Sequence, residues 1–246
     1  MKMILKRKIL FLFLIVLYSV GANAQNLRYS TGRKLTTASN TLNYKIPGKS
    51  YVFLSTVYGS VFLYENWLSG SLNLENGAVY DSLSLKLNTF LEELILFNRR
   101  AGALITVDKD AVKEFTLINE LGNKEIYQKM YLDEIPAGYR YLNVLYDGKI
   151  KLFLWNKTDE IAESPYYDLT GSLRNTKYVL KKIYYLDLPD KGMIRFIPQK
   201  RSVIELFPEH KKEIKRLQRR EHLTYKGNSE IVRAIKLLET NIFNLN

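Results

Sequence analysis

The sequence predicts a mainly β protein of the α+β class, an antiparallel meander sheet (a single curved sheet or a sandwich) followed by short C-terminal helices. Three observations predict it. Residues 67–87 alternate between apolar and polar side chains around Asn76-Gly77, which indicates a hairpin with one buried face. Residues 139–155 flank a second turn signal, Asp147-Gly148, with bulky side chains on both faces. From Lys200 onward the apolar spacing becomes helical.

The N-terminus has the layout of a secretory signal peptide over residues 1–24. Four basic residues precede the apolar run 9–17, and residues 22–24 offer a small-x-small cleavage site. The run is too short to span a bilayer of about 30 Å. The chain has no cysteine, which a lipoprotein needs at its cleavage site. We therefore expect export to the periplasm or outer membrane, or out of the cell, and not as a lipoprotein; an uncleaved anchor is the alternative.

After the signal we expect an extended leader over residues 25–49, a β-rich domain over 50–198 and a basic helical tail over 199–246, packed on or beside the sheet. The formal charge of +12 falls to +8 once the four basic residues of the signal are removed. A basic surface attracts acidic glycans, lipid headgroups or acidic proteins. Scattered cations that only maintain solubility are the alternative.

The β-rich domain begins with residues 51–64, which have the composition of one or two strands. Asn76-Gly77 then predicts a type I′ turn with positive φ at both residues, and Glu75 opposite Ala78. That register predicts one apolar face, made of Leu68, Leu72, Leu74, Val79, Leu83, Leu85 and Leu87. Short runs at residues 93–97, 103–107 and 112–117 continue the meander.

Asp147-Gly148 predicts a second type I′ turn. One face of this hairpin is assigned to the core, with Tyr141, Leu145, Ile150, Leu152 and Leu154. The other face is the candidate ligand or partner face, with Arg140, Tyr146, Lys149, Lys151 and Trp155. Aromatic rings beside cations suit sugars or a protein hot spot. The alternative is that the helical tail covers this face and that Trp155 belongs to the core.

A polar connection is expected over residues 159–176, and a third hairpin over 178–197. In the tail, Pro208 fits the first turn of a helix. Asn228 or Ser229 is expected to cap the last helix, which has an apolar stripe of Ile231, Ala234, Ile235 and Leu238.

The tail also carries two basic stripes at i+4 spacing, formed by Lys211, Lys215 and Arg219 and by Lys212, Arg216 and Arg220. Residues 200–226 have a local excess of five positive charges. These stripes suit phosphates or an anionic lipid surface, and a solvated outer face is the alternative. Export argues against nucleic acid as the partner.

No pattern predicts catalysis, a cofactor or a metal. The two histidines, His210 and His222, lie in the basic tail, and no Gly-x-Ser-x-Gly elbow or phosphate-binding glycine loop occurs. A hydrolase would have to use Glu92-Glu93 or Asp108-x-Asp110, because glycoside hydrolysis needs two carboxylates across a cleft. A strand-connecting turn is the alternative for Asp108-Lys-Asp110.

The signal, the Gly70-x-Leu and Asn76-Gly77 hairpin with Tyr80, Val112-x-x-Phe115 and the ending Ser202-Val-Ile-Glu-Leu-Phe207 together resemble uncharacterised exported envelope proteins of Gram-negative bacteria. The resemblance implies a β-rich body with a charged helical tail over nearly the whole exported chain. It implies no activity and no functional residues. This chain departs from the pattern where Pro-Glu-His follows Phe207.

These observations lead us to expect an exported, non-enzymatic envelope protein, a binding or accessory subunit of a periplasmic or outer-membrane assembly with a protein partner. A carbohydrate-binding module that uses Trp155, or Trp67 with Tyr80, is one alternative. A hydrolase that uses carboxylates is another. Glycans and anionic lipid are the alternative partners.

Overall fold

The computed structural model describes residues 46–51, 59–134 and 136–242. All of these residues belong to one compact unit that begins at Thr37. The other unit, residues 1–36, lies outside the described residues, as do the predicted signal peptide and most of the predicted leader. In the part of the chain that is described, no helix has the length and apolar character needed to cross a membrane.

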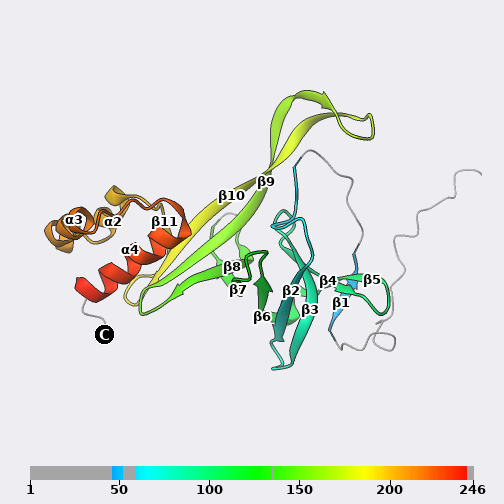
Figure 1. Cartoon of the computed structure of the whole chain (residues 1–246), viewed down its shortest axis with the longest axis horizontal. Coiled ribbons are helices and arrows are strands. Elements are labelled where there is room, and N and C mark those ends of the chain that lie inside the picture. The colour runs from blue at the N-terminus through cyan, green and yellow to red at the C-terminus, as the bar shows by residue number, and fades with distance from the viewer. Residues whose placement is uncertain (1–45, 52–58, 135, 243–246) are drawn as a thin grey trace, which may run out of the picture. The chain divides into compact units, whose positions relative to one another are not determined.

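The described strands form one open antiparallel sheet in the order β1-β5-β4-β3-β2-β6-β7-β8-β9-β10-β11 (Figure 1). Their bounds are β1 (Gly48–Ser50), β2 (Leu68–Leu74), β3 (Val79–Asn88), β4 (Glu93–Asn98), β5 (Ala103–Val107), β6 (Val112–Ile118), β7 (Lys124–Leu132), β8 (Gly138–Asp147), β9 (Lys151–Tyr167), β10 (Leu173–Leu188) and β11 (Gly192–Phe196). The predicted fold class is confirmed, with a single sheet and not a sandwich.

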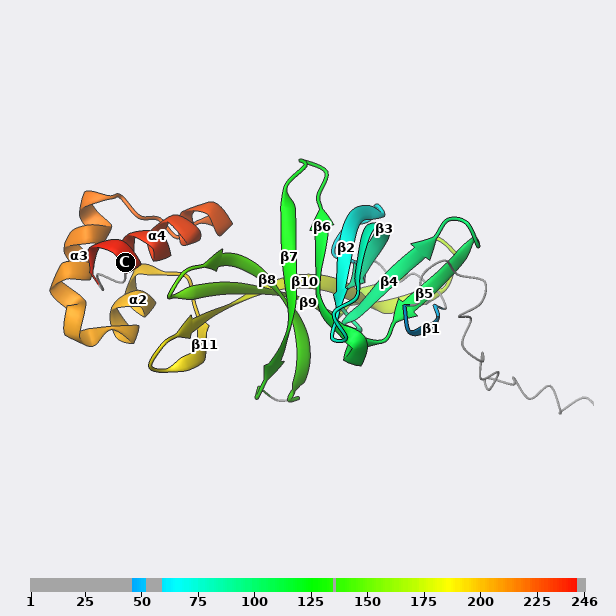
Figure 2. The ribbon, with the colours of Figure 1, turned by 90° about the horizontal axis from the view of Figure 1, so that it is seen from below.

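The sheet consists of two meanders, β2 to β5 and β6 to β11, that meet where β6 pairs with β2. A continuous meander would place β6 beside β5, but β1 occupies that position. The strands change direction steadily along the sheet, as Figure 2 shows between β8 and β5, which is the ordinary twist of antiparallel strands. Strands were also expected at residues 51–64. Residues 52–58 lie outside the described residues, and residues 59–64 form no strand but contain one isolated bridge, from Phe62 to Asn88.

The first hairpin, β2 and β3, has a different turn from the one predicted. Of the two turn residues Asn76 and Gly77, only Gly77 takes a positive φ, +82°, and its N–H donates to the Leu74 carbonyl. The loop is therefore three residues long, a type I turn followed by a left-handed glycine. The extra residue shifts the register next to the turn, so Val79 is 60% exposed and not in the core. A bulge near Ser82 restores the predicted register at Gly70 and Leu83, and the other predicted core leucines are buried.

The second hairpin, β8 and β9, is also longer at its turn than predicted. Asp147 pairs with Lys151, and neither Asp147 nor Gly148 takes a positive φ. The loop is instead held by the tail, because the buried Ile150 N–H donates to Glu239 Oε2 at 3.1 Å. The residues assigned to its core face are all at least partly buried.

The polar connection expected at residues 159–176 is wrong, because β9 and β10 continue through it as a paired ribbon (Figure 1). In this region β9 and β10 pair with each other and with few other strands, because β8 pairs with β9 only as far as Trp155. A ribbon with two wet faces needs no apolar alternation, so its sequence looks like a loop. The Asp168 carboxylate fixes the tip by accepting bonds from the Thr170 and Ser172 N–H groups and from Arg174.

The tail comprises α2 (Lys200–Leu206), η2 (Pro208–His210), α3 (Lys211–Arg220) and α4 (Gly227–Asn241). Its predicted apolar stripe is buried, in one cluster with Leu152, Leu154 and Leu186. The tail therefore covers the Leu152 face of β9. Of the alternative offered for the Trp155 face, tail cover is wrong, but Trp155 does belong to a buried cluster, with Leu142, Phe153 and Tyr185. No side chain caps α4: Asn228 lies within the helix and accepts a hydrogen bond from the Tyr184 hydroxyl.

The sheet curls until the turn between β3 and β4 touches β9 and β10. The Thr158 N–H donates to the Thr89 carbonyl at 3.0 Å, and the two threonine hydroxyl oxygens lie 2.7 Å apart. Beside them, the rings of Phe90 and Tyr178 lie 4.9 Å apart. These contacts hold residues 88–92 over the face of β8 to β11, and a pocket lies beneath them.

Candidate functional site

The candidate site is built on Glu92, the last residue of the β3–β4 turn. Glu92 has a positive φ of +56°, a strained value for a residue with a side chain. It is nearly fully buried. Strain and a buried carboxyl in one residue often mark a functional position.

Both oxygens of the Glu92 carboxyl have partners from distant strands. The Trp155 indole N–H on β9 donates to Oε1 at 2.6 Å, and the Tyr141 backbone N–H on β8 donates to Oε2 at 3.2 Å. These two bonds tie the turn to the sheet. Burial raises the pKa of Glu92, although Trp155, Lys109, Tyr141 and Arg140 each act in the opposite direction.

Trp155 is only 7% exposed, and cations lie against its ring. The Arg140 guanidinium carbon is 5.5 Å from the ring centroid and the Lys157 ammonium is 5.7 Å from it. Arg140 is further fixed by bonds to the carbonyls of Pro136 and Tyr139. The indole ring is therefore in contact with two cations of the pocket wall.

A pocket of about 490 Å³, here called the Trp155 pocket, opens among these groups. Charged side chains from seven segments line it: Glu92, Lys109, Glu134, Arg140, Lys157, Asp159, Lys181 and Arg195. Five are basic and three are acidic. Asp159 binds both Lys157 and Lys181 at 2.7 Å, and Arg195 lies 3.8 Å from Glu134. The basic groups thus outnumber the acidic groups that neutralise them.

Lys109, in the short helix η1 (Lys109–Ala111), completes the wall beside Glu92. Burial lowers its pKa, Glu92 acts to raise it, and Arg140 adds to the lowering. Its ammonium lies 5.1 Å from the centroid of the Tyr141 ring and donates to the Tyr139 carbonyl.

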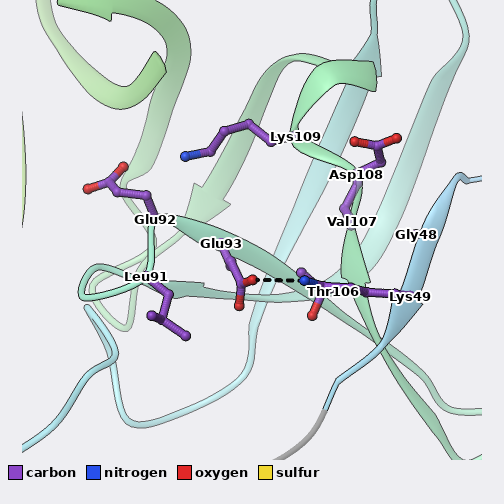
Figure 3. Close-up of a pocket in the computed structure, with 9 residues that line it drawn as sticks. All are labelled: Gly48, Lys49, Leu91, Glu92, Glu93, Thr106, Val107, Asp108 and Lys109. Atoms are coloured by element: carbon purple, nitrogen blue, oxygen red, sulfur yellow. Dashed lines mark ion pairs between the residues drawn. The ribbon is translucent and has the colours of Figure 1, made fainter. Parts of the chain in front are cut away.

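A second pocket of about 520 Å³, the Glu93 pocket, shares Leu91, Glu92 and Lys109 with the first (Figure 3). Glu92 and Glu93 point in different directions there, and Glu93 pairs with Lys49 at 3.5 Å. The Asp108 carboxylate accepts the Asp110 N–H, so this stretch is the turn that the sequence offered as the alternative. Of the four carboxylates named for a hydrolase, Glu92, Glu93 and Asp108 line the Glu93 pocket, where Glu93 is held by Lys49 and Asp108 by the η1 backbone.

The candidate face predicted for the second hairpin is divided. Arg140 and Trp155 line the Trp155 pocket, whereas Tyr146, Lys149 and Lys151 lie at the other end of the hairpin. Tyr146 packs against the tail, with the Lys236 ammonium 5.3 Å from its ring centroid. Lys151 pairs with Asp147, and Lys149 is exposed.

The other aromatic site proposed from the sequence, Trp67 with Tyr80, is not assembled either. Tyr80 pairs with Leu72, five residues along the chain from Trp67. At about 3.3 Å per residue, five residues of strand place the two rings about 16 Å apart along the strand, too far to hold the same sugar ring. Trp67 instead contacts Phe97, at 5.6 Å between centroids.

Most of the pocket was missed by reasoning from the sequence. Lys157 and Asp159 extend the period-two alternation of Trp155, but the predicted hairpin ended at Trp155 and the predicted connection began at Asp159. Lys109, Lys181 and Arg195 come from three other segments, and no local spacing relates them. Within the described ranges, no three acidic or histidine side chains gather in a way that would hold a metal ion. Neither the family models, the curated proteins nor the solved structures contain a match to this chain.

Proposed function

We propose that this chain is an exported, non-enzymatic binding protein of the cell envelope that takes an acidic ligand in the Trp155 pocket. The supporting observation is the convergence of five basic and three acidic side chains on one pocket. Export rests on the signal-like residues 1–24.

The charge balance of the pocket favours an anion. Lys157 and Lys181 share a single acid, Asp159. Both oxygens of Glu92 already accept bonds, from the Trp155 indole N–H and the Tyr141 backbone N–H. An incoming carboxylate or phosphate would complete the neutralisation, and charge-assisted bonds to such groups are among the strongest in proteins.

The same geometry counts against a neutral sugar. A stacking platform needs an open ring face, but Trp155 is buried, has cations against its ring and uses its N–H on Glu92. A sugar is therefore a suitable ligand here only if it carries an acidic group.

The test uses fluorescence of Trp155. The chain has two tryptophans, so Trp67→Phe leaves Trp155 as the only reporter. We expect titration with glucuronate or inorganic phosphate to change the emission of this variant, and glucose, the neutral counterpart of glucuronate, to leave it unchanged. A flat response to both anions at low salt would overturn the proposal.

A pair of variants on one strand locates the effect. Lys157→Gln removes a pocket cation, and affinity should fall about fivefold, the equivalent of about 1 kcal/mol. Lys151→Gln removes an equal charge from β9 outside the pocket and should leave affinity unchanged. Equal losses in both variants would show general electrostatic attraction and no defined site.

A further inference from the structure

The outer side of α3 carries a dense group of cations, here called the α3 basic face: Lys211, Lys212, Lys215, Arg216, Arg219 and Arg220. All six are exposed, whereas Ile214, Leu217 and Gln218 on the inner side are buried. The Gln218 amide also donates to the Lys200 carbonyl and the Tyr225 hydroxyl. The helix is therefore fixed in rotation, with its charges outward.

Nearby acids do little to neutralise this face. Glu213, the single acidic residue within α3, accepts from His210 at 2.7 Å. Glu221 pairs with Arg220 at 2.9 Å and also with Arg233. Among the described residues, the other five cations of the face form no ion pair.

This arrangement opposes the stability of the helix. Like charges at i+4, such as Lys211 with Lys215, repel each other. Lys211 and Lys212 also lie at the N-terminus of α3, where the helix dipole favours acidic residues. Helix formation alone therefore does not account for the face.

We infer that the α3 basic face docks on a membrane surface rich in anionic lipid. This inference is independent of the ligand proposed for the Trp155 pocket. The face offers only long cationic side chains and Glu213, with no exposed aromatic or apolar anchor. Protein hot spots rely on such anchors, whereas a fluid layer of phosphate headgroups can rearrange to meet flexible cations. Because Ile214 and Leu217 face inward, the helix lies on the headgroups and does not insert.

The test measures co-sedimentation with vesicles at low salt, using the chain that begins at Gln25, as the predicted cleavage leaves it. We expect binding to phosphatidylcholine vesicles that contain phosphatidylglycerol and none to pure phosphatidylcholine. Raising the salt to physiological strength or above should weaken binding steeply, since the screening length falls to about 8 Å or less. Absence of binding to the anionic vesicles would overturn the inference.

Matched variants separate the face from net charge. Lys211→Gln, Lys212→Gln and Lys215→Gln together should weaken vesicle binding roughly hundredfold, because each basic residue near an anionic surface contributes about fivefold. Gln is about as good a helix former as Lys, so the fold should be unaffected. The control variant, Lys113→Gln with Lys124→Gln and Lys182→Gln, removes the same charge from exposed sites on the sheet and should change vesicle binding little. Equal losses in the two triple variants would overturn the inference.

Two further measurements identify the partner. Binding of soluble polyglutamate through these residues, without vesicle binding, would assign the face to an acidic protein and overturn the lipid inference. Lys157→Gln, which tests the pocket, should leave vesicle binding intact. The two proposals can thus fail separately.

Discussion

The indole N–H of Trp155 donates to Glu92 Oε1 at 2.6 Å, and this bond joins β9 to a turn 63 residues earlier in the chain. Glu92 reaches this position with a left-handed backbone. The bond thus connects the two meanders of the sheet at the wall of the Trp155 pocket.

Trp155→Phe should lower the free energy of unfolding by about 2 kcal/mol, because it leaves a buried carboxylate oxygen without its donor. Urea denaturation at neutral pH measures the change. Trp67→Phe is the control. Residue 67 is half-buried, and the phenylalanine ring can keep the contact with Phe97, so the free energy of unfolding should fall by less than about 1 kcal/mol. If the two variants are equally destabilised, the Glu92 bond contributes nothing specific.

The raised pKa of Glu92 gives stability a defined pH dependence. Below the unfolded pKa of about 4.3 the carboxyl is protonated in both states. As pH rises above that value, the unfolded state loses the proton first, so the contribution of Glu92 falls as pH passes through the folded pKa. The unfolding free energy of the wild type minus that of Glu92→Gln should therefore decrease with rising pH. A difference that increases with pH contradicts the raised pKa.

Two glycines of the first hairpin should respond differently to substitution by alanine. A Cβ on Gly77 meets nothing within 4 Å. Gly77→Ala should therefore lower the free energy of unfolding by about 1 kcal/mol, the cost of a left-handed backbone for a residue with a side chain. A Cβ on Gly70 would lie 2.0 Å from the Thr116 carbonyl oxygen, so Gly70→Ala forces β2 and β6 apart and should cost about 3 kcal/mol. Thermal or urea unfolding gives both values. The reverse order would contradict the described turn and strand approach.

Glu239 anchors the tail to the second hairpin through the Ile150 N–H. Glu239→Ala should destabilise the protein by about 1–3 kcal/mol, because this buried N–H loses its acceptor. Glu239→Gln retains a carbonyl oxygen and should cost clearly less. Unfolding monitored by circular dichroism compares the two, and equal costs would show that the hydrogen bond is unimportant.

The fold class was predictable because the β2–β3 hairpin buries one face only. Leu68, Leu72 and Leu85 alternate with polar residues, and all three are buried. The local register was less predictable, since Asn-Gly suits loops of two or three residues and the choice decides whether Val79 faces the core or water. For the same reason the β9–β10 ribbon was missed: both its faces are wet, so its residues carry no apolar period.

The site was predictable only in part. Arg140 and Trp155 were singled out because cations and an aromatic alternate on one strand face, and both line the pocket. Glu92 was considered only as half of an acidic pair. Its actual partners, Trp155 and Tyr141, come within reach through the curl of the whole sheet, which no spacing in the sequence reveals.

The contact between Thr89 and Thr158 has a consequence for the order of folding. In the sheet, β2, β6, β7 and β8 lie between β3 and β9, so this contact can form only after those strands have paired. Closure by long-range contacts is slow and comes late. The Thr158 amide should accordingly exchange its hydrogen whenever the two meanders separate, without global unfolding. An acidic ligand held beneath the turn should slow that exchange, which would make this single amide a reporter of the occupied state.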